Sequence, residues 1–285
     1  MQGHTKVFEV KVMARVLEVS ESGYYAWRKQ RQAMQNDADY DLKQEILRLR
    51  EHSRNSYGYR QVYLKLRDAG HQINRKRVQR IMQEQGWVVK AKRRTVRTTN
   101  SMHSHPIAAN WLNRDFSATG MNQKWLSDIT YVQTMEGWLY VCVVLDVFSG
   151  RIVGWAARAD MSEDLVLDAL KMAFEQRRPA PGLMVHTDRG IQFAARAYVK
   201  LLTTHHALQS MSRKGDCYDN AMMESWNARY KVEWLPEQNY VSRSLAKLDL
   251  FEYIEVHYNR RRPKTRLGGL SPAQFEAKHL AEFRK

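Results

Sequence analysis

The feature that most limits how this chain can fold is a change in its apolar pattern near residue 120. Upstream, apolar residues recur at the three- and four-residue spacing of amphipathic helices. Downstream, three apolar segments rich in β-branched residues follow one another with short turns between them, at 124–133, 138–148 and 151–158. Segments joined in this way predict an antiparallel meander. The pattern therefore predicts a helical amino-terminal part followed by a sheet.

The order of elements after the meander indicates the fold class. It is a helix at 162–175, a strand at 183–187, a helix at 194–203, a strand at 208–211 and a long helix after residue 219. Strands and helices in this order predict a mixed five-stranded sheet with helices packed on it, which is an α/β architecture.

The upstream part is predicted to contain two helix-turn-helix units. Two short helices are expected within 10–31, and three more at 40–52, 59–68 and 74–85. The first pair is compatible with DNA binding, but short amphipathic pairs are common in other proteins too. The second unit carries the stronger indication, because its last helix is strongly basic.

Basic residues crowd the first turns of the helix predicted at 74–85, although the helix dipole favours anions there. Contact between a recognition helix and DNA phosphates explains them, and a solvated basic face is the alternative. Residues 90–109 lose all periodicity and form a basic linker, which either tracks a DNA backbone or has no fixed structure. The expected DNA contacts of both segments are Arg75, Lys76, Arg77, Arg80, Lys92, Arg93, Arg94 and Arg97.

The charge of the chain indicates a polyanionic partner. Its 285 residues include 46 Lys and Arg against 30 Asp and Glu, a net charge of +16. Residues 1–99 hold 22 basic and 10 acidic side chains, net +12, and residues 100–285 hold 24 and 20, net +4. Nucleic acid and an anionic membrane are the candidates. The longest apolar run, 138–145, is far shorter than the ~20 residues that span a bilayer, and we expect no membrane partner.

Cysteine usage favours the cytoplasm. The chain contains two cysteines, Cys142 and Cys217, and neither belongs to a C-x-x-C pair. A disulfide framework and a zinc finger are therefore not expected, whereas a reducing compartment is.

Three acidic residues do not fit their surroundings. Asp128 stands within an apolar strand, where a carboxylate is costly to bury. Asp188 follows the strand at 183–187, and Glu224 lies at the edge of the apolar stripe of the next long helix. Carboxylates from three elements suit Mg²⁺, and two ions about 3.5–4 Å apart would stabilise the attacking and leaving oxygens of a phosphoryl displacement. This pattern fits a metal-dependent phosphodiester enzyme, with a non-catalytic DNA binder as the alternative.

Three runs in order carry a resemblance to a known family. They are WLSDITY at 125–131, HTDRG at 186–190 and DNAMME at 219–224, and 35 residues separate Asp188 from Glu224. The chain resembles the DDE transposases and retroviral-type integrases over nearly all of its 285 residues. Within that group it is most similar to the downstream-frame proteins of bacterial insertion sequences of the IS-three type.

The resemblance implies an RNase H-like core in which Asp128, Asp188 and Glu224 form the catalytic, metal-binding triad. It implies two Mg²⁺ ions, with Mn²⁺ as a substitute, one activating water or a DNA 3′-hydroxyl and the other stabilising the leaving 3′-oxygen. The implied reaction cleaves DNA at the element ends and transfers the 3′-hydroxyl to another phosphodiester. The side chains implied to contact phosphates there are Lys231, Arg213 and Lys214.

The implied partner is double-stranded DNA, as insertion-sequence terminal repeats and target DNA, in the bacterial cytoplasm at the nucleoid. Coupling two ends implies at least a homodimer on DNA. An upstream-frame helix-turn-helix and coiled-coil protein is a further implied partner, since no long leucine heptads occur here. DNA-binding regulation without catalysis, and RNase H-like hydrolysis without joining, stay open as alternatives.

The expected domains are an N-terminal helical segment 1–39, a helix-turn-helix domain 40–89, a basic linker 90–117, the catalytic core 118–235 and a C-terminal helical basic region 236–285.

Two further polar residues have open roles. Asp146, at the end of the second predicted strand, either contacts metal or fixes the following turn. His186 shares the strand face of Asp188 and either orients a ligand or packs in the core.

Overall fold

The computed structural model describes residues 4, 7–35, 37–88, 105–213, 217–235 and 239–283. The chain forms two compact units, Met1–His52 and Ser53–Lys285. Within the described ranges, every helix is too short or too polar to cross a membrane.

The first unit is helical, as predicted. It contains α1 (Val10–Val16), α2 (Glu21–Gln35) and α3 (Tyr40–His52). At the start of α2, the Ser20 hydroxyl oxygen accepts a hydrogen bond from the backbone N–H of Gly23 at 3.0 Å. This bond satisfies a donor that the first turn of a helix leaves without a partner.

The second unit begins with two further predicted helices, α4 (Tyr59–Asp68) and α5 (Arg75–Glu84). Their apolar stripes are buried, including Leu66 on α4 and Ile81 on α5. The Asn74 side chain accepts a hydrogen bond from the backbone N–H of Lys76 at 2.9 Å and so caps the first turn of α5.

The sheet of the second unit has five strands in the order β3-β2-β1-β4-β5. β1, β2 and β3 pair antiparallel as the predicted meander, whereas β4 pairs parallel with β1, and β5 pairs parallel with β4. The strands are β1 (Lys124–Thr134), β2 (Gly137–Asp146), β3 (Ile152–Arg158), β4 (Met184–Thr187) and β5 (Leu208–Met211).

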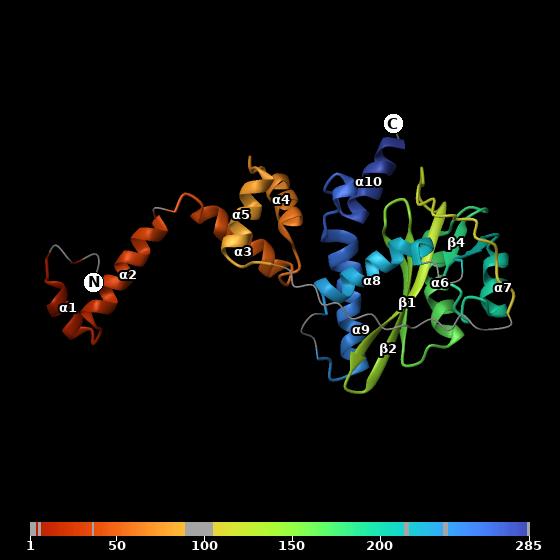
Figure 1. The fold of residues 1–285 in the computed structure, drawn as a ribbon, viewed down its shortest axis with the longest axis horizontal. Coiled ribbons are helices and arrows are strands. Elements are labelled where there is room, and N and C mark those ends of the chain that lie inside the picture. Colours follow the sequence, from red (N-terminus) through yellow and green to blue (C-terminus); the bar gives the residue numbers. More distant parts are fainter. Residues whose placement is uncertain are drawn as a thin grey trace. The chain divides into compact units, whose positions relative to one another are not determined.

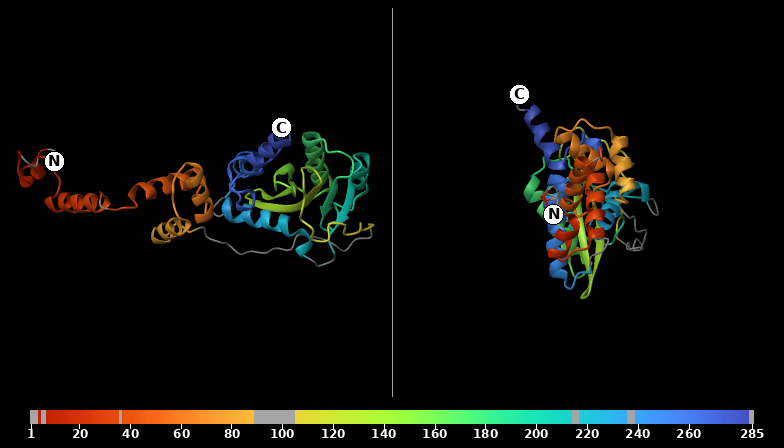
Figure 2. Two further views of the ribbon diagram at one scale, coloured as in Figure 1. Left: turned by 90° about the horizontal axis from the view of Figure 1, so that it is seen from above. Right: turned by 90° about the vertical axis from the view of Figure 1, so that its left-hand side faces the viewer.

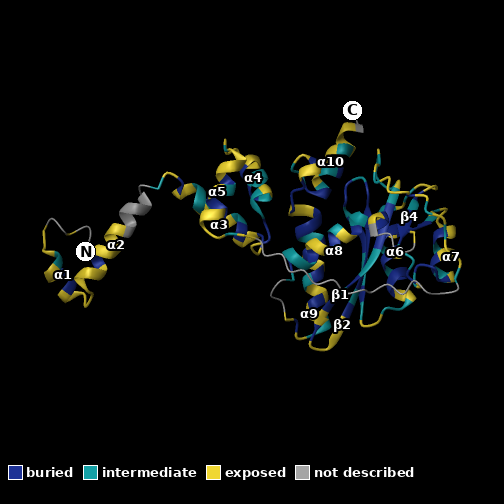
Figure 3. Ribbon diagram, viewed as in Figure 1, coloured by how far each residue is buried: buried dark blue, intermediate teal, exposed yellow. Residues whose placement is uncertain are grey.

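Helices cover both faces of this sheet (Figure 1). On one face lie α6 (Glu163–Arg177) and α7 (Arg196–Thr204), and on the other lie α8 (Ala221–Glu233) and α9 (Arg243–Phe251). In the left view of Figure 2, the green α6 and the light blue α8 flank the strands from opposite sides. Figure 3 shows the buried residues concentrated along the strands between these helices. The predicted α/β class with a mixed five-stranded sheet is confirmed.

The helix α6 packs very closely on β3 at a glycine. A Cβ added to Gly154 would lie 2.3 Å from the backbone oxygen of Ala169 and 2.7 Å from the Ala173 Cβ. Because backbone atoms cannot move aside as a flexible side chain can, only glycine allows this approach.

The carboxyl-terminal residues pack against the α8 face of the core. Their elements after α9 are the π-helix η3 (Glu252–Arg261), the short 3-10 helix η4 (Thr265–Leu267) and α10 (Pro272–Phe283). The rings of Tyr253 and Tyr258 contact that of Trp226 on α8, with centroids 6.0 and 6.1 Å apart. The Asn259 side-chain amide accepts from the N–H of Ile152 and donates to its carbonyl, both at 2.9 Å. Asn259 thus takes the place of a strand partner at the start of β3.

Candidate active site and DNA-binding surface

Two of the three predicted carboxylates lie on neighbouring strands or directly after them. In the parallel ladder between β1 and β4, Leu126 is the partner of His186. Two residues further along lie Asp128, within β1, and Asp188, just past the last residue of β4. Since alternate residues of a strand project to the same face, Asp128 lies on the face that α8 covers, as Leu126 does, and the Asp188 carboxylate lies near enough to help raise its pKa.

The Asp128 carboxylate is held on both of its oxygens. Oδ2 accepts a hydrogen bond from the Asn227 side-chain amide of α8 at 2.8 Å, and Oδ1 accepts one from the backbone N–H of Ile129 at 2.9 Å. Burial raises the Asp128 pKa to about 8, and the nearby carboxylates of Asp188 and Glu224 add to the increase. Asp128 therefore lies in a site where negative charges repel one another.

The other two predicted triad members occupy different settings. Asp188 follows β4, and its Oδ1 accepts a hydrogen bond from the backbone N–H of Gly190 at 2.9 Å, which fixes the turn. Glu224 lies in the first turn of α8 and is exposed, whereas Met223 and Trp226 on either side of it are buried. Partial burial raises the Glu224 pKa.

The donor set suits a hard divalent cation. Among the described residues, no three Asp, Glu, His or Cys side chains stand close enough together to hold an ion as they are placed. The three carboxylates nevertheless provide the oxygen ligands that Mg²⁺ prefers, and a cation would relieve the part of the Asp128 pKa increase that Asp188 and Glu224 add to the effect of burial. Assignment of the triad as metal ligands stays a prediction.

Lys231, one of the predicted phosphate contacts, also lies on the α8 side of the site. Its ammonium nitrogen sits 4.2 Å from the ring centroid of Tyr131 on β1, in a cation–π contact. Burial lowers the Lys231 pKa, and the Asp128 carboxylate acts in the opposite direction. The lysine is thus positioned by the sheet and lies near enough to Asp128 to feel its charge.

Arg213, a second predicted contact, forms an ion pair with Asp219, a residue that sequence reasoning missed. The guanidinium donates to both Asp219 oxygens at 3.1 Å, and Asn110 and Arg114 donate to the same carboxylate. The hydrogen bonds from Arg213 are the largest influence, and they hold the Asp219 pKa at about 2. Asp219 lies in the 3-10 helix η2 (Cys217–Asn220) just before α8, so this cluster fixes the start of the helix that carries Glu224. Lys214 lies outside the described residues.

His186 packs in the core as a hydrogen-bonded bridge. Its two ring nitrogens lie 2.8 Å from the Ser210 hydroxyl and 3.0 Å from the Ser212 hydroxyl. Burial lowers the His186 pKa to about 4, so the ring is neutral near pH 7. These contacts favour packing over an orienting role for a ligand, because both nitrogens are engaged between β4 and the end of β5.

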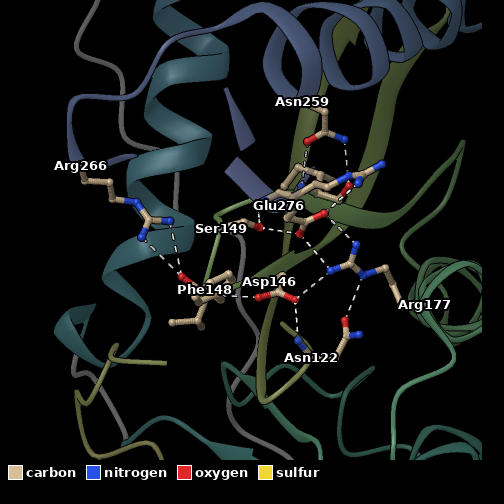
Figure 4. Close-up of polar contacts among 11 residues, drawn as sticks. Asn122, Asp146, Phe148, Ser149, Arg177, Asn259, Arg266 and Glu276 are labelled. Carbon is tan, nitrogen blue, oxygen red and sulfur yellow. Dashed lines mark hydrogen bonds and ion pairs between the residues drawn. The ribbon is translucent and has the colours of Figure 1, made fainter. Parts of the chain in front are cut away.

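Asp146 fixes the turn after β2 (Figure 4). Its carboxylate accepts hydrogen bonds from the backbone N–H groups of Asn122 at 2.8 Å and Phe148 at 2.9 Å, and pairs with Arg177 at 3.3 Å. Arg177 in turn pairs with Glu276 of α10 at 2.9 Å. The buried carboxylate of Asp146 is thus occupied in a structural network, and these contacts support the turn role over a metal-binding one.

The predicted DNA-contacting residues of α5 lie at the protein surface. All four are exposed, and Arg80 also forms an ion pair with Glu84 one turn later at 2.8 Å. They are Arg75, Lys76, Arg77 and Arg80. A hollow of 920 Å³ beside the start of α5 is lined by Arg67 of α4 and by Arg75 and Lys76. The predicted linker contacts Lys92, Arg93, Arg94 and Arg97 lie outside the described residues.

Domain families match three stretches of the chain. Residues 118–217 match an integrase core domain, and residues 206–272 match a second family described in the same words. Residues 35–95 match an HTH-like domain. The expected integrase core, preceded by a helix-turn-helix region, is confirmed.

Solved structures that the chain matches at low identity include viral integrases. A simian T-cell lymphotropic virus intasome, in complex with the PP2A regulatory subunit B56 gamma, is 15% identical, with a TM-score of 0.47 over 81% of this chain and 74% of its own. The HTLV-2 integrase catalytic core domain, solved in complex with magnesium, is 17% identical, with a TM-score of 0.40 over 54% of this chain and 96% of its own.

Curated relatives match almost the whole chain. Transposase InsF for insertion sequence IS3A, from Escherichia coli strain K12, is 39% identical over 283 residues, which are 99% of this chain and 98% of the relative. The insertion element IS600 uncharacterized 31 kDa protein, from Shigella sonnei, is 41% identical over 267 residues, 94% of this chain and 98% of the relative. The resemblance predicted from the sequence motifs is confirmed, and the chain belongs to the IS3 family of insertion-sequence transposases.

Proposed function

We propose that this transposase cleaves DNA at the ends of its insertion sequence and joins the freed 3′-hydroxyl to another phosphodiester, with Asp128, Asp188 and Glu224 as its catalytic and metal-binding residues. The supporting observation is that Asp128 lies on the face of the sheet that α8 covers, with the Asp188 carboxylate just past β4 and Glu224 on α8 both near enough to act on its pKa. Burial is the main cause of the raised Asp128 pKa, and the nearby Asp188 and Glu224 carboxylates add a repulsion that a bound cation would relieve.

Each residue has a role that follows from its position. Divalent ions held there, two Mg²⁺ or Mn²⁺ in their place, would stabilise the attacking and leaving oxygens of an in-line displacement. Asn227 and the Ile129 N–H fix the Asp128 carboxylate before substrate arrives. Glu224 is exposed at the start of α8 and so meets DNA from the solvent side. Lys231, held over Tyr131, would contact a phosphate beside the scissile bond.

DNA binding is assigned to the exposed bases of α5 and to those around the active site. The proposed further contacts are Arg213, Lys214, Lys92, Arg93, Arg94 and Arg97.

Because two ends are joined in one reaction, the active species is at least a dimer on DNA, at the bacterial nucleoid. An upstream-frame helix-turn-helix and coiled-coil protein is the proposed additional partner. The proposed domain boundaries are 1–39, 40–89, 90–117, 118–235 and 236–285.

The test of the active site is Glu224→Gln, which removes a charge without changing the size of the side chain. We expect cleavage of an element-end duplex in Mg²⁺ to fall by about a thousandfold or more, the scale at which one essential group acts in catalysis, while affinity for the duplex stays within about threefold. Glu163→Gln is the matched control, since Glu163 is an exposed glutamate in the first turn of α6 on the opposite face of the sheet.

The outcomes separate this function from its alternatives. Cleavage that survives Glu224→Gln would contradict the site assignment. Wild-type protein that binds element ends, but neither cuts nor joins them with any divalent ion, would be a regulator. Hydrolysis without 3′-hydroxyl joining would indicate a nuclease.

A further inference from the structure

A single arginine ahead of α4 is engaged by the carboxyl-terminal helices. The Arg54 guanidinium forms ion pairs with Asp249 of α9 at 2.6 Å and with Glu252 at the start of η3 at 2.7 Å. The same group lies 4.3 Å from the ring centroid of Trp234, at the end of α8. Only arginine combines two divergent ion pairs with stacking on an indole, because its guanidinium is planar and carries several donors.

Other contacts extend this attachment along the chain. The Tyr57 hydroxyl donates to the carbonyl of Arg261 at 3.2 Å, and the Tyr57 ring lies 5.6 Å from that of His257. On α4 itself, Leu64 approaches Gly269 so closely that a Cβ there would lie 3.2 Å from the Leu64 Cδ2. The attachment therefore includes the helix as well as the segment before it.

The backbone of the segment supports a fixed, specific attachment. Arg54 and Asn55 have φ angles of 51° and 59°, a left-handed conformation that non-glycine residues rarely adopt. Residues keep such a conformation where contacts with the surrounding structure offset its energetic cost. On the receiving side, the Tyr240 hydroxyl donates to Asp249 and so fixes the carboxylate that Arg54 meets.

We infer that Arg54 is a positioning residue that holds the DNA-reading helices α4 and α5 on the carboxyl-terminal helices, at a set distance from the catalytic sheet. The sequence between α5 and β1 predicts only a basic linker, which alone would let α5 carry a bound DNA end to variable positions. With the attachment, a DNA end bound at α5 lies at a fixed distance from Glu224 on α8, so the same phosphate of each end reaches this residue. This inference rests on the proposed function, in which α5 binds DNA and α8 carries a catalytic residue.

The first test measures the attachment without using activity. In the full-length protein, Arg54→Ala should increase amide hydrogen exchange at residues 53–58 about tenfold relative to wild type, as expected when local contacts are lost. Arg60→Ala is the matched control: Arg60 is exposed on α4 and contacts the adjacent Tyr59, so its loss removes the same charge. Unchanged exchange in Arg54→Ala would overturn the inference, whether or not the protein cleaves DNA.

The second test links the attachment to the reaction. Arg54→Glu should reduce cleavage at the correct end position about tenfold and spread the cuts over neighbouring phosphates, because repulsion from Asp249 and Glu252 detaches the segment. Adding Asp249→Arg restores an opposite-charge pair and should recover position-specific cleavage. Absence of recovery, with both proteins folded by circular dichroism, counts against a positioning role. If wild type does not cleave at all, the proposed function fails and the exchange result still decides the attachment.

A disulfide gives an independent measurement. A Cβ on Gly269 lies 3.9 Å from that of Leu64, within the roughly 3.5–4.5 Å that disulfides need, so Leu64→Cys combined with Gly269→Cys should cross-link on mild oxidation. Because Gly269 has a φ of 93°, which strains any side chain placed there, cleavage by the oxidised protein is compared with cleavage by the same double variant in its reduced form. Leu64→Cys alone is the control. The cross-linked protein should keep its end cleavage, since it is held in the productive arrangement. Cleavage that disappears on oxidation and returns on reduction would show that α4 must detach for catalysis, which contradicts the inference.

Discussion

Two aspartates of the sheet, Asp128 and Asp146, differ in what compensates their charge. Asp146 is fully buried and has an arginine and two backbone N–H donors, so the increase that burial causes in its pKa is opposed by three partners. Asp128 has one amide, one N–H and two neighbouring carboxylates, and its pKa rises to about 8. The arginine and N–H partners of Asp146 mark it as a structural residue, whereas the carboxylates beside Asp128 leave it with a negative charge that a cation would compensate.

Removal of Arg177, the ion-pair partner of Asp146, should destabilise the fold strongly. Arg177→Met would leave Asp146 and Glu276 buried without their arginine, although Arg151 still reaches Glu276 at 2.8 Å. We expect the free energy of unfolding to fall by about 3–5 kcal/mol, the cost of breaking a buried pair. Urea denaturation at pH 7 measures it. In the control, Arg158→Met breaks an exposed pair with Asp168 and should cost under about 1 kcal/mol. Equal losses in the two variants would contradict the structural role of the network.

The Asp219 cluster should make stability depend on acid pH. Its folded pKa of about 2 lies below the roughly 3.9 of an unfolded aspartate, so the unfolded state binds more protons between these values. The stabilisation is therefore complete above about pH 4 and is lost as the pH falls toward 2. Asp219→Asn should have a lower melting temperature than wild type at pH 7, with a difference that shrinks toward pH 2. Melting curves of both proteins over this range check it, and a constant difference would count against the lowered pKa.

Sequence reasoning finds residues that conflict with their local setting, but it does not find their partners. Asp128 was recognisable because an acid within an apolar strand is unusual. Asp219 was not, because an aspartate before a helix is ordinary, and its partner Arg114 lies 105 residues away. Arg262 belongs to a basic run that would suit a DNA contact, yet it is 4% exposed and pairs with Glu233. Such pairs depend on tertiary packing, which no local pattern contains.

At the scale of elements, the contact between α6 and β3 depends on one missing side chain. Gly154→Ala would place a Cβ 2.3 Å from the Ala169 oxygen, so the helix must shift away from the strand. We expect a loss of about 1–3 kcal/mol in the free energy of unfolding, typical of an overpacked core, measured by chemical denaturation. Gly120→Ala serves as the comparison, because its Cβ would meet nothing closer than the Gln123 side chain at 3.5 Å. A Gly154→Ala protein as stable as wild type would show that α6 adjusts freely.

Elements with a regular apolar repeat were predicted well, and the irregular ones were not. The predicted bounds of α3 (Tyr40–His52) and α4 (Tyr59–Asp68) agree with the structure, since a helix period and a clear stop are both visible in the sequence. The π-helix η3 (Glu252–Arg261) was not predicted in detail, because its widened turn has no distinct residue period. The order β3-β2-β1-β4-β5 was also not predicted, because residue alternation reveals strands but not their neighbours.

At the scale of the whole molecule, the net charge of +16 is divided unevenly between two parts of the chain. The net +12 of residues 1–99 includes the exposed bases of α5, whereas residues 100–285, with a net +4, hold the carboxylates of the proposed metal site. Lys231 lies near enough to Asp128 to feel its charge, whereas Arg213 pairs with Asp219 before α8. We propose that the excess charge marks the part of the chain that binds DNA, and that the near-neutral part contains the site of cleavage.

Salt dependence of DNA binding tests this division. Each phosphate contact adds about 0.9 to the slope of log affinity against log salt concentration, so replacing Arg75, Lys76 and Arg77 together by alanine should reduce the slope by up to about 2.7. If these residues contact only phosphates, the triple variant should lose the same affinity for element-end and unrelated duplexes. If they also contact bases, the loss of affinity should be larger for element ends. The matched control replaces Lys171, Arg196 and Lys200, exposed bases of α6 and α7 on the opposite face of the sheet from α8. Equal reductions in both triple variants would mean that overall charge, and not the α5 face, attracts DNA.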